Sequence, residues 1–77
     1  MEYTPGQIPT PEQIRAARKA AGDTQEKAAS RLFAKRRAWT NWEMPITSPE
    51  HRDMSALAYE VYLFKTGQIK ELSGMKK

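Results

Sequence analysis

The chain has 77 residues, no cysteine, and 13 Lys and Arg against nine Asp and Glu, for a formal net charge of +4. This length suits one small domain that is near the lower limit for a self-sufficient core, so a partner subunit would help it. The absence of cysteine excludes disulfides, thiolate catalysis and Cys-ligated zinc, and no apolar run approaches the ~20 residues of a membrane span. We therefore expect a cytoplasmic protein with no membrane contact, and the basic balance favours a polyanionic partner such as nucleic acid.

Catalysis has little support in the sequence. The single histidine, His51, stands in a segment with Pro and Ser and has no acid or nucleophile arranged around it. A site built on His51 would need catalytic partners from elsewhere in the chain. We expect no enzymatic activity, no metal, no cofactor and no small-molecule ligand.

The first predicted helix follows an extended segment. Three prolines among the first eleven residues deny helix hydrogen bonds to residues 1–9, which we interpret as an N-terminal arm. Thr10 supplies an N-cap, Gln13 completes a capping box with it, and Gly22 suits the left-handed stop of a helix. These signals predict a helix over residues 11–21.

A second helix should begin only about two residues later. Asp23 or Thr24 can cap it, and small or apolar residues recur at helical spacing up to Leu32. The third helix should start at Lys35 or Arg36 and end near Met44, because the following proline disfavours the helical conformation.

The rest of the chain predicts one more helix. Residues 44–53 carry two prolines and read as a loop with room for one short helical turn. The last helix should run from about Met54 to Thr66, and residues 68–77 should form a fraying tail. The predicted fold is an all-α bundle of four to five helices, with residues 10–67 as the domain.

The predicted third helix has two chemically different faces. At 100° per residue, Trp39, Trp42 and Glu43 lie on one side, which makes the tryptophans candidate core anchors. Arg37, Thr40 and Asn41 lie opposite, with Arg36 at the edge of their face. Cations at a helix N-terminus oppose its dipole by about 0.3–1 kcal/mol each, so an anion should offset them, and Arg and Asn are suitable donors to guanine and adenine edges.

The segment IRAARKAAGDTQEKAASRLFAKRRAWTNWE resembles the helix-turn-helix core of Cro/C1-type repressors, also called the xenobiotic-response-element (XRE) family. The shared features include G-x-T-Q-x-x-A-A, a tight turn and a third helix that ends in W-E. The later MSALAYEVYLFKTG resembles the closing helix of small phage and bacterial members, including regulators associated with anti-CRISPR operons.

The resemblance implies a lambda-repressor-like DNA-binding domain and a role for individual residues. The positions that match base-reading residues are Arg36, Arg37, Thr40 and Asn41. The candidates for the DNA backbone are Gln25, Lys27 and Lys35, and Gln25 also matches a contact to an outer base. Ala29 matches the small residue where two helices cross, and Arg18 and Glu43 match a partly buried ion pair. That pair is also expected from the helical wheel, since Glu43 needs a cation on the tryptophan face.

Two positions depart from the family pattern. Phe33 stands where the family commonly has Gly in the turn, and Lys35 stands where Ser or Thr often caps the third helix. We expect either that the second helix extends through Phe33 or that the third helix begins at a different angle.

One reading helix spans only a few base pairs, so such folds usually pair two of them on a palindromic site. Two apolar stripes run along the last predicted helix. The first contains Met54, Leu57, Ala58, Val61 and Phe64. The second, roughly opposite, contains Ala56, Tyr59 and Leu63. We expect the first stripe to pack on the core and the second to form a homodimer seam; alternatively, Tyr59 and Leu63 pack on Ile8, Ile69 or Leu72.

The sequence thus predicts a homodimeric transcriptional regulator of a phage or mobile element, a repressor or autoregulator that binds double-stranded operator DNA. The main alternative is a protein-interaction module, an antitoxin or adaptor, whose basic helix binds an acidic protein. Binding to anionic lipid or to RNA has weaker support, because the fold should occupy the tryptophan face and the helix spacing favours duplex DNA.

Overall fold

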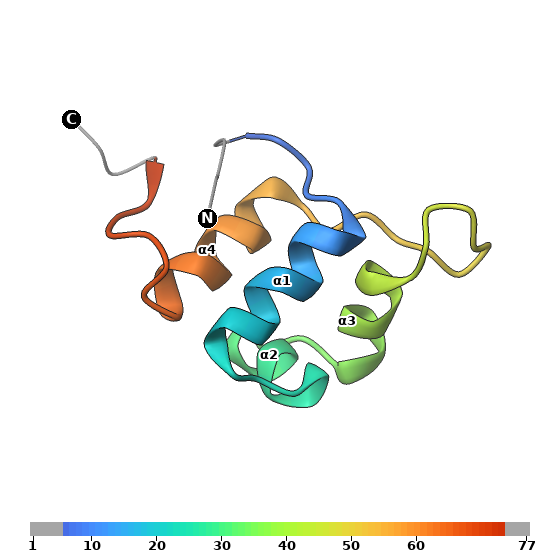
Figure 1. Ribbon diagram of the computed structural model, residues 1–77, viewed down its shortest axis with the longest axis horizontal. Coiled ribbons are helices and arrows are strands. Elements are labelled where there is room, and N and C mark those ends of the chain that lie inside the picture. Colours follow the sequence, from blue (N-terminus) through green and yellow to red (C-terminus); the bar gives the residue numbers. More distant parts are fainter. Residues whose placement is uncertain (1–5, 74–77) are drawn as a thin grey trace.

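The computed structural model describes residues 6–73, which contain four α-helices and no strands (Figure 1). The helices are α1 (Pro11–Ala21), α2 (Gln25–Arg31), α3 (Arg36–Glu43) and α4 (Ala56–Lys65). α2 packs against both α3 and α4, and α1 packs against α3. The all-α prediction is confirmed for this part of the chain, where none of the helices is long and apolar enough to cross a membrane.

α1 begins at the predicted capping box. The Thr10 hydroxyl accepts from the Gln13 backbone N–H at 3.1 Å, and the Gln13 side chain accepts from the Thr10 backbone N–H at 2.8 Å. Pro11 occupies the first helical position, where its missing N–H is not needed. The predicted bounds of this helix are confirmed.

α1 and α4 end on a glycine with a left-handed backbone. Gly22 has φ 73° and Gly67 has φ 76°. The N–H of each glycine and the N–H of the next residue donate back to carbonyls of the last helical turn. This Schellman arrangement satisfies backbone groups that a helix end leaves unpaired, and glycine adopts the required φ without a Cβ clash.

α2 ends in the same arrangement, but a phenylalanine takes the glycine's place. Phe33 has φ 57°, its N–H donates to the Ser30 carbonyl at 3.1 Å, and the next N–H, of Ala34, donates to the Ala29 carbonyl at 3.0 Å. A left-handed backbone costs a residue with a Cβ about 1–2 kcal/mol. Of the two stated alternatives, an extension of α2 through Phe33 is wrong, because the helix stops at Arg31. The tight turn is present even though it requires a positive φ at Phe33.

α3 starts without a side-chain cap and stops before a proline. Lys35 is extended at the N-cap position and makes no cap hydrogen bond, as expected for a lysine. The helix covers Arg36 to Glu43, and Met44 turns to an extended backbone immediately before Pro45. The predicted end of α3 is confirmed.

The segment 44–55 forms turns and no helix. The backbone N–H of Ser48 donates to the Pro45 carbonyl at 2.8 Å, and that of His51 donates to the Ser48 carbonyl at 3.1 Å. The His51 ring is half-buried and lies 2.9 Å from both the Met44 carbonyl and the Asp53 carboxylate. Thus His51 links the Met44 carbonyl at the start of this loop to Asp53 near its end.

The core lies between the helices and is built around one tryptophan. Trp39 is fully buried, and its ring lies 5.5 Å from Trp42 and 4.8 Å from Tyr62 between centroids. Trp42 is half-buried against the same cluster. Other buried hydrophobic residues are Ile14, Ala17, Ala28, Ala29, Met54, Tyr59 and Leu63. The predicted anchors Trp39 and Ala29 are therefore core residues, and Trp42 borders the core.

The predicted division of α4 into a core stripe and a dimer seam is wrong for the seam and for Leu57, whereas Met54 and Ala58 of the core stripe lie in or against the core. Tyr59 and Leu63, assigned to the seam, are 4% and 0% exposed, and Ala56 is half-buried. Leu57, assigned to the core, is 69% exposed. Both stripes were visible on the helical wheel, but a wheel does not say which stripe faces the core.

The segment after α4 folds back onto the helices. The Gln68 side chain donates to the Ala17 carbonyl of α1 at 3.0 Å, and Ile69 packs against the core. The Ser73 hydroxyl donates to Glu60 at 2.8 Å. Residues 68–73 are thus not the fraying tail that we expected; residues 1–5 of the predicted arm and 74–77 of the predicted tail lie outside the described residues.

Candidate nucleic-acid interface

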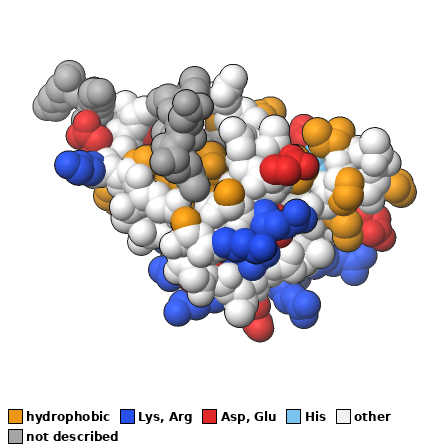
Figure 2. All heavy atoms as spheres, viewed as in Figure 1, with side chains coloured by type: hydrophobic (Ala, Val, Ile, Leu, Met, Phe, Trp, Pro, Cys, Tyr) orange, Lys and Arg blue, Asp and Glu red, His pale blue; other side chains and the backbone are white. Residues whose placement is uncertain are grey.

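α3 separates an anchoring face from a cationic face, as the helical wheel predicts. Arg36 and Arg37 are exposed, and Thr40 and Asn41 are half-buried. Within residues 6–73, no ion pair engages either arginine. Figure 2 shows most of the visible Lys and Arg side chains over the half of the molecule that holds α1, α2 and α3. The outer face of α3 therefore presents uncompensated positive charge beside hydrogen-bonding groups.

The opposite face of α3 is fixed by a buried carboxylate. Glu43 is 4% exposed and accepts from Arg18 at 2.6 and 3.2 Å, which confirms the predicted ion pair. The Trp39 indole N–H donates to the same carboxylate at 2.6 Å, and the Gln25 amide donates to it at 3.2 Å. Arg15 adds a second cation at 3.5 Å. One carboxylate thus joins α1, α2 and α3.

These contacts hold Glu43 in its charged form. Burial alone would raise the pKa of this carboxyl, because a buried charge loses its hydration. Hydrogen bonds from Arg18, Trp39 and Gln25 outweigh that effect, and the pKa of Glu43 lies below its ordinary value. The carboxylate therefore stays ionised at neutral pH and keeps Arg18 in place.

Gln25 and Thr40 connect the two faces, which changes the roles expected of them. The Thr40 hydroxyl lies 3.1 Å from both the Gln25 amide oxygen and the Arg36 carbonyl, so its single proton is used inside the protein. The Gln25 amide nitrogen gives one N–H to Glu43 and keeps a second. Gln25 can thus offer one donor to a DNA phosphate, whereas Thr40 can offer only its lone pairs.

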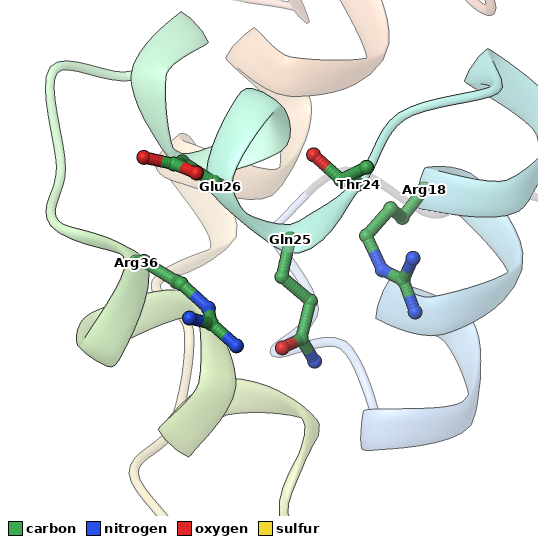
Figure 3. A pocket seen from close by; sticks show the side chains of 5 residues that line it. All are labelled: Arg18, Thr24, Gln25, Glu26 and Arg36. Carbon is green, nitrogen blue, oxygen red and sulfur yellow. The ribbon is translucent and has the colours of Figure 1, made fainter.

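A hollow of about 380 Å³ opens where α1, α2 and α3 meet. It is lined by Arg18, Thr24, Gln25, Glu26 and Arg36. Figure 3 shows the Gln25 side chain between those of Arg18 and Arg36, while the Glu26 carboxylate points away from both arginines. The Arg36 guanidinium and the Gln25 amide are therefore placed to meet one anionic group at the edge of the α3 face.

The other two residues expected at the DNA backbone, Lys27 and Lys35, are exposed on α2 and directly before α3. Neither lines the hollow. They are exposed cations outside the hollow, which suits a long-range electrostatic attraction to DNA better than a fixed contact.

A second buried carboxylate was not foreseen as part of the framework. Asp23 is 6% exposed and accepts from Arg31 at 2.6 and 3.1 Å and from the Tyr62 hydroxyl at 2.8 Å. The hydrogen bond from Arg31 is the main cause that lowers the pKa of Asp23, and burial raises the pKa of Tyr62. The sequence offered Asp23 only as a possible N-cap, because its contact with Tyr62 spans 39 positions and leaves no local pattern.

No family model, no curated protein and no solved structure matches this chain in the comparisons. Within residues 6–73, no three His, Asp or Glu side chains gather as they would to hold a metal ion.

Proposed function

We propose that the protein binds double-stranded DNA in a sequence-dependent manner, with α2, the turn at Phe33 and α3 acting as a helix-turn-helix. The observation that carries the proposal is the asymmetry of α3. Arg37 and Asn41 lie opposite a face that Trp39 and Glu43 fix to the rest of the molecule, and the exposed Arg36 stands at the edge between the two faces. A helix that is packed against the protein on one face and cationic on the opposite face can enter a major groove.

The chemistry of the exposed side chains supports base reading. A guanidinium can donate two hydrogen bonds to the O6 and N7 atoms of guanine, and an Asn amide can pair with the N6 and N7 atoms of adenine. Arg37 and Asn41 are four residues apart and so lie on one side of α3. Each can therefore address a base while its neighbours contact the backbone.

The phosphate backbone would supply most of the affinity. Arg36 and Gln25, which has one free N–H, line the hollow at the edge of α3, and Lys27 and Lys35 are exposed cations on α2 and directly before α3. Contacts of this kind set the position of a protein on the duplex and make binding dependent on salt.

In this proposal the protein is a transcriptional regulator that represses by occupying its operator, which excludes polymerase. It acts as a homodimer, so that two α3 helices reach half-sites about one DNA turn apart, ~34 Å. The proposal needs no cofactor, since direct occupation of DNA is sufficient for repression.

The division between base contacts and backbone contacts is testable. On a site selected from a random duplex pool, Arg37→Ala and Asn41→Ala should each cost about 1–3 kcal/mol, and should relax the preference at particular base pairs. Lys27→Ala should instead weaken binding to all duplexes alike and reduce the slope of affinity against salt. Fluorescence anisotropy on the selected site and on single-base variants measures both effects. Equal losses for all three variants on every duplex would contradict the proposed roles.

A further inference from the structure

The outer face of α4 carries apolar side chains that nothing in the described part of the chain covers. Leu57 is 69% exposed, Phe64 is 41% exposed and Val61 is half-buried. Their spacing of i, i+4 and i+7 places them on one side of the helix, opposite the buried Tyr59 and Leu63. α4 thus has one face in the core and a second apolar face at the surface.

Phe33 extends this face from the turn between α2 and α3. Its side chain is 93% exposed, although its left-handed backbone would suit glycine. The Lys65 ammonium lies 4.8 Å from the centre of its ring and also donates to the Arg31 carbonyl at 2.7 Å. Lys65 therefore links the ring to α4, and the chain keeps a protruding aromatic ring where the fold itself favours a smaller residue.

A hollow of about 290 Å³ lies beside the ring. Its lining is mostly apolar and consists of Leu32, Phe33, Ser55, Leu57, Ala58, Val61 and Lys65. The surface therefore contains both a projection and a recess. In a two-fold interface the same surface meets itself, so a projection next to a recess is self-complementary.

We propose that this surface, consisting of Phe33, Leu57, Val61 and Phe64, binds a second copy of the chain about a two-fold axis. The Phe33 ring of each copy enters the hollow between Leu57 and Val61 of the other. This inference deepens the proposed function, because it names the partner and the surface that bring two recognition helices together. It replaces the predicted seam, whose Tyr59 and Leu63 are in the core.

The amount of apolar surface fits this occupant. A Phe side chain carries about 200 Å², so the exposed parts of Phe33, Phe64 and Leu57 together present roughly 400 Å², the size of the largest apolar patches on monomeric proteins. Two such faces with their neighbours reach about 1,000 Å² of buried surface, the lower end of a specific interface. The dimer should therefore be of moderate affinity.

Sedimentation equilibrium of the full chain without DNA tests the proposal. Over about 1 µM to 1 mM, the range in which complexes of modest affinity dissociate, the wild-type mass should rise from 8.8 kDa toward twice that value. Leu57→Glu and Phe33→Gly should each raise the dissociation constant at least about tenfold, with unchanged helical circular dichroism. Glycine suits the backbone at position 33, so Phe33→Gly removes the ring without straining the turn.

Ile46→Glu is the matched control, because Ile46 is also 69% exposed but lies in the loop before α4 and outside this surface. It should dimerise like the wild type. A wild type that stays at 8.8 kDa up to about 1 mM would overturn the proposal, and so would a Leu57→Glu variant that dimerises as the wild type does. Because no DNA is present, either result leaves the DNA-binding proposal to be judged separately by anisotropy on a single half-site.

Discussion

Glu43 is the single residue on which the position of α3 depends most. Its carboxylate receives donors from Arg18, Trp39 and Gln25, which come from α1, α3 and α2 in turn. Charge-assisted hydrogen bonds are about twice as strong as neutral ones, and several donors converge on the same two oxygens. The orientation of the cationic face is therefore set by a contact on the opposite side of the same helix.

Replacing Glu43 with Gln should lower the free energy of unfolding by about 2–4 kcal/mol. The amide keeps the shape of the side chain but leaves Arg18 without its buried counter-charge. Urea unfolding followed by circular dichroism measures the change. Glu50→Gln, on an exposed side chain, should stay within about 0.5 kcal/mol of the wild type, and a similar small value for Glu43→Gln would contradict the assigned role.

The two buried carboxyls that pair with arginines, those of Glu43 and Asp23, also predict how stability changes with acid. The native pKa of Glu43 and that of Asp23 both lie below their ordinary values. The unfolded chain therefore takes up protons at a higher pH than the native chain does. Their stabilisation is complete above the ordinary carboxyl pKa of about 4 and is lost as the pH falls toward the lowered native values.

Urea midpoints from pH 7 down to pH 3 would measure this loss. Glu43→Gln should lose less stability over that interval than the wild type, since it lacks one of the two carboxyls whose pKa is lowered in the native chain. Parallel curves for the two proteins would show that Glu43 contributes nothing to the acid dependence.

The turn between α2 and α3 has an unfavourable backbone conformation, because Phe33 has a positive φ although it is not a glycine. α1, α2 and α4 end in the same hydrogen-bonded arrangement, and only α2 uses a residue with a side chain for it. The left-handed backbone of Phe33 destabilises the fold of a single chain. Its ring is 93% exposed and so buries little apolar surface that could offset this. Such local strain is often found where a surface has a role outside its own fold.

The strain can be measured by comparing two small residues at this position. Phe33→Gly should be more stable than Phe33→Ala by about 0.5–1 kcal/mol, because both lose the ring but only alanine keeps the Cβ clash. Urea unfolding at a concentration where the wild type is monomeric isolates this effect. At the exposed helical position Ala16, glycine should instead destabilise by about 1 kcal/mol. A glycine at 33 that is no better than alanine would exclude backbone strain there.

On the scale of the whole molecule, local sequence patterns predicted where the helices begin and end, whereas tertiary contacts determine which face of each helix is buried. The capping box at Thr10 and the proline after Met44 act within a few residues, and the structure has both ends where these signals predict them. For α4, both apolar stripes were found, but Tyr59 and Leu63 were assigned to the surface and Leu57 to the core, the reverse of what the structure shows for these three residues. The core side contains Tyr62, whose hydroxyl bonds to the distant Asp23, and a contact across 39 positions leaves no local signal.

The contacts around α3 also divide into those that local sequence patterns predict and those that depend on residues distant in the chain. The grouping of Trp39 with Glu43 follows from helical spacing, and the Arg18 pair was expected from the family resemblance and from the need to neutralise a buried charge. The link from Gln25 to both Thr40 and Glu43 was not predicted, since it depends on how α2 crosses α3. Sequence therefore indicated which side chains face outward on α3 but not which of their donors are already used.

Fluorescence anisotropy on two duplexes decides whether the exposed face of α3 reads DNA sequence. The purified protein is titrated into a duplex from directly upstream of its own gene and into a scrambled duplex, at several salt concentrations. If α3 reads sequence, the protein binds tightly to the upstream duplex alone, with an affinity that falls as salt rises. Equal binding to both duplexes, or no binding to either at low salt, would contradict the proposed function.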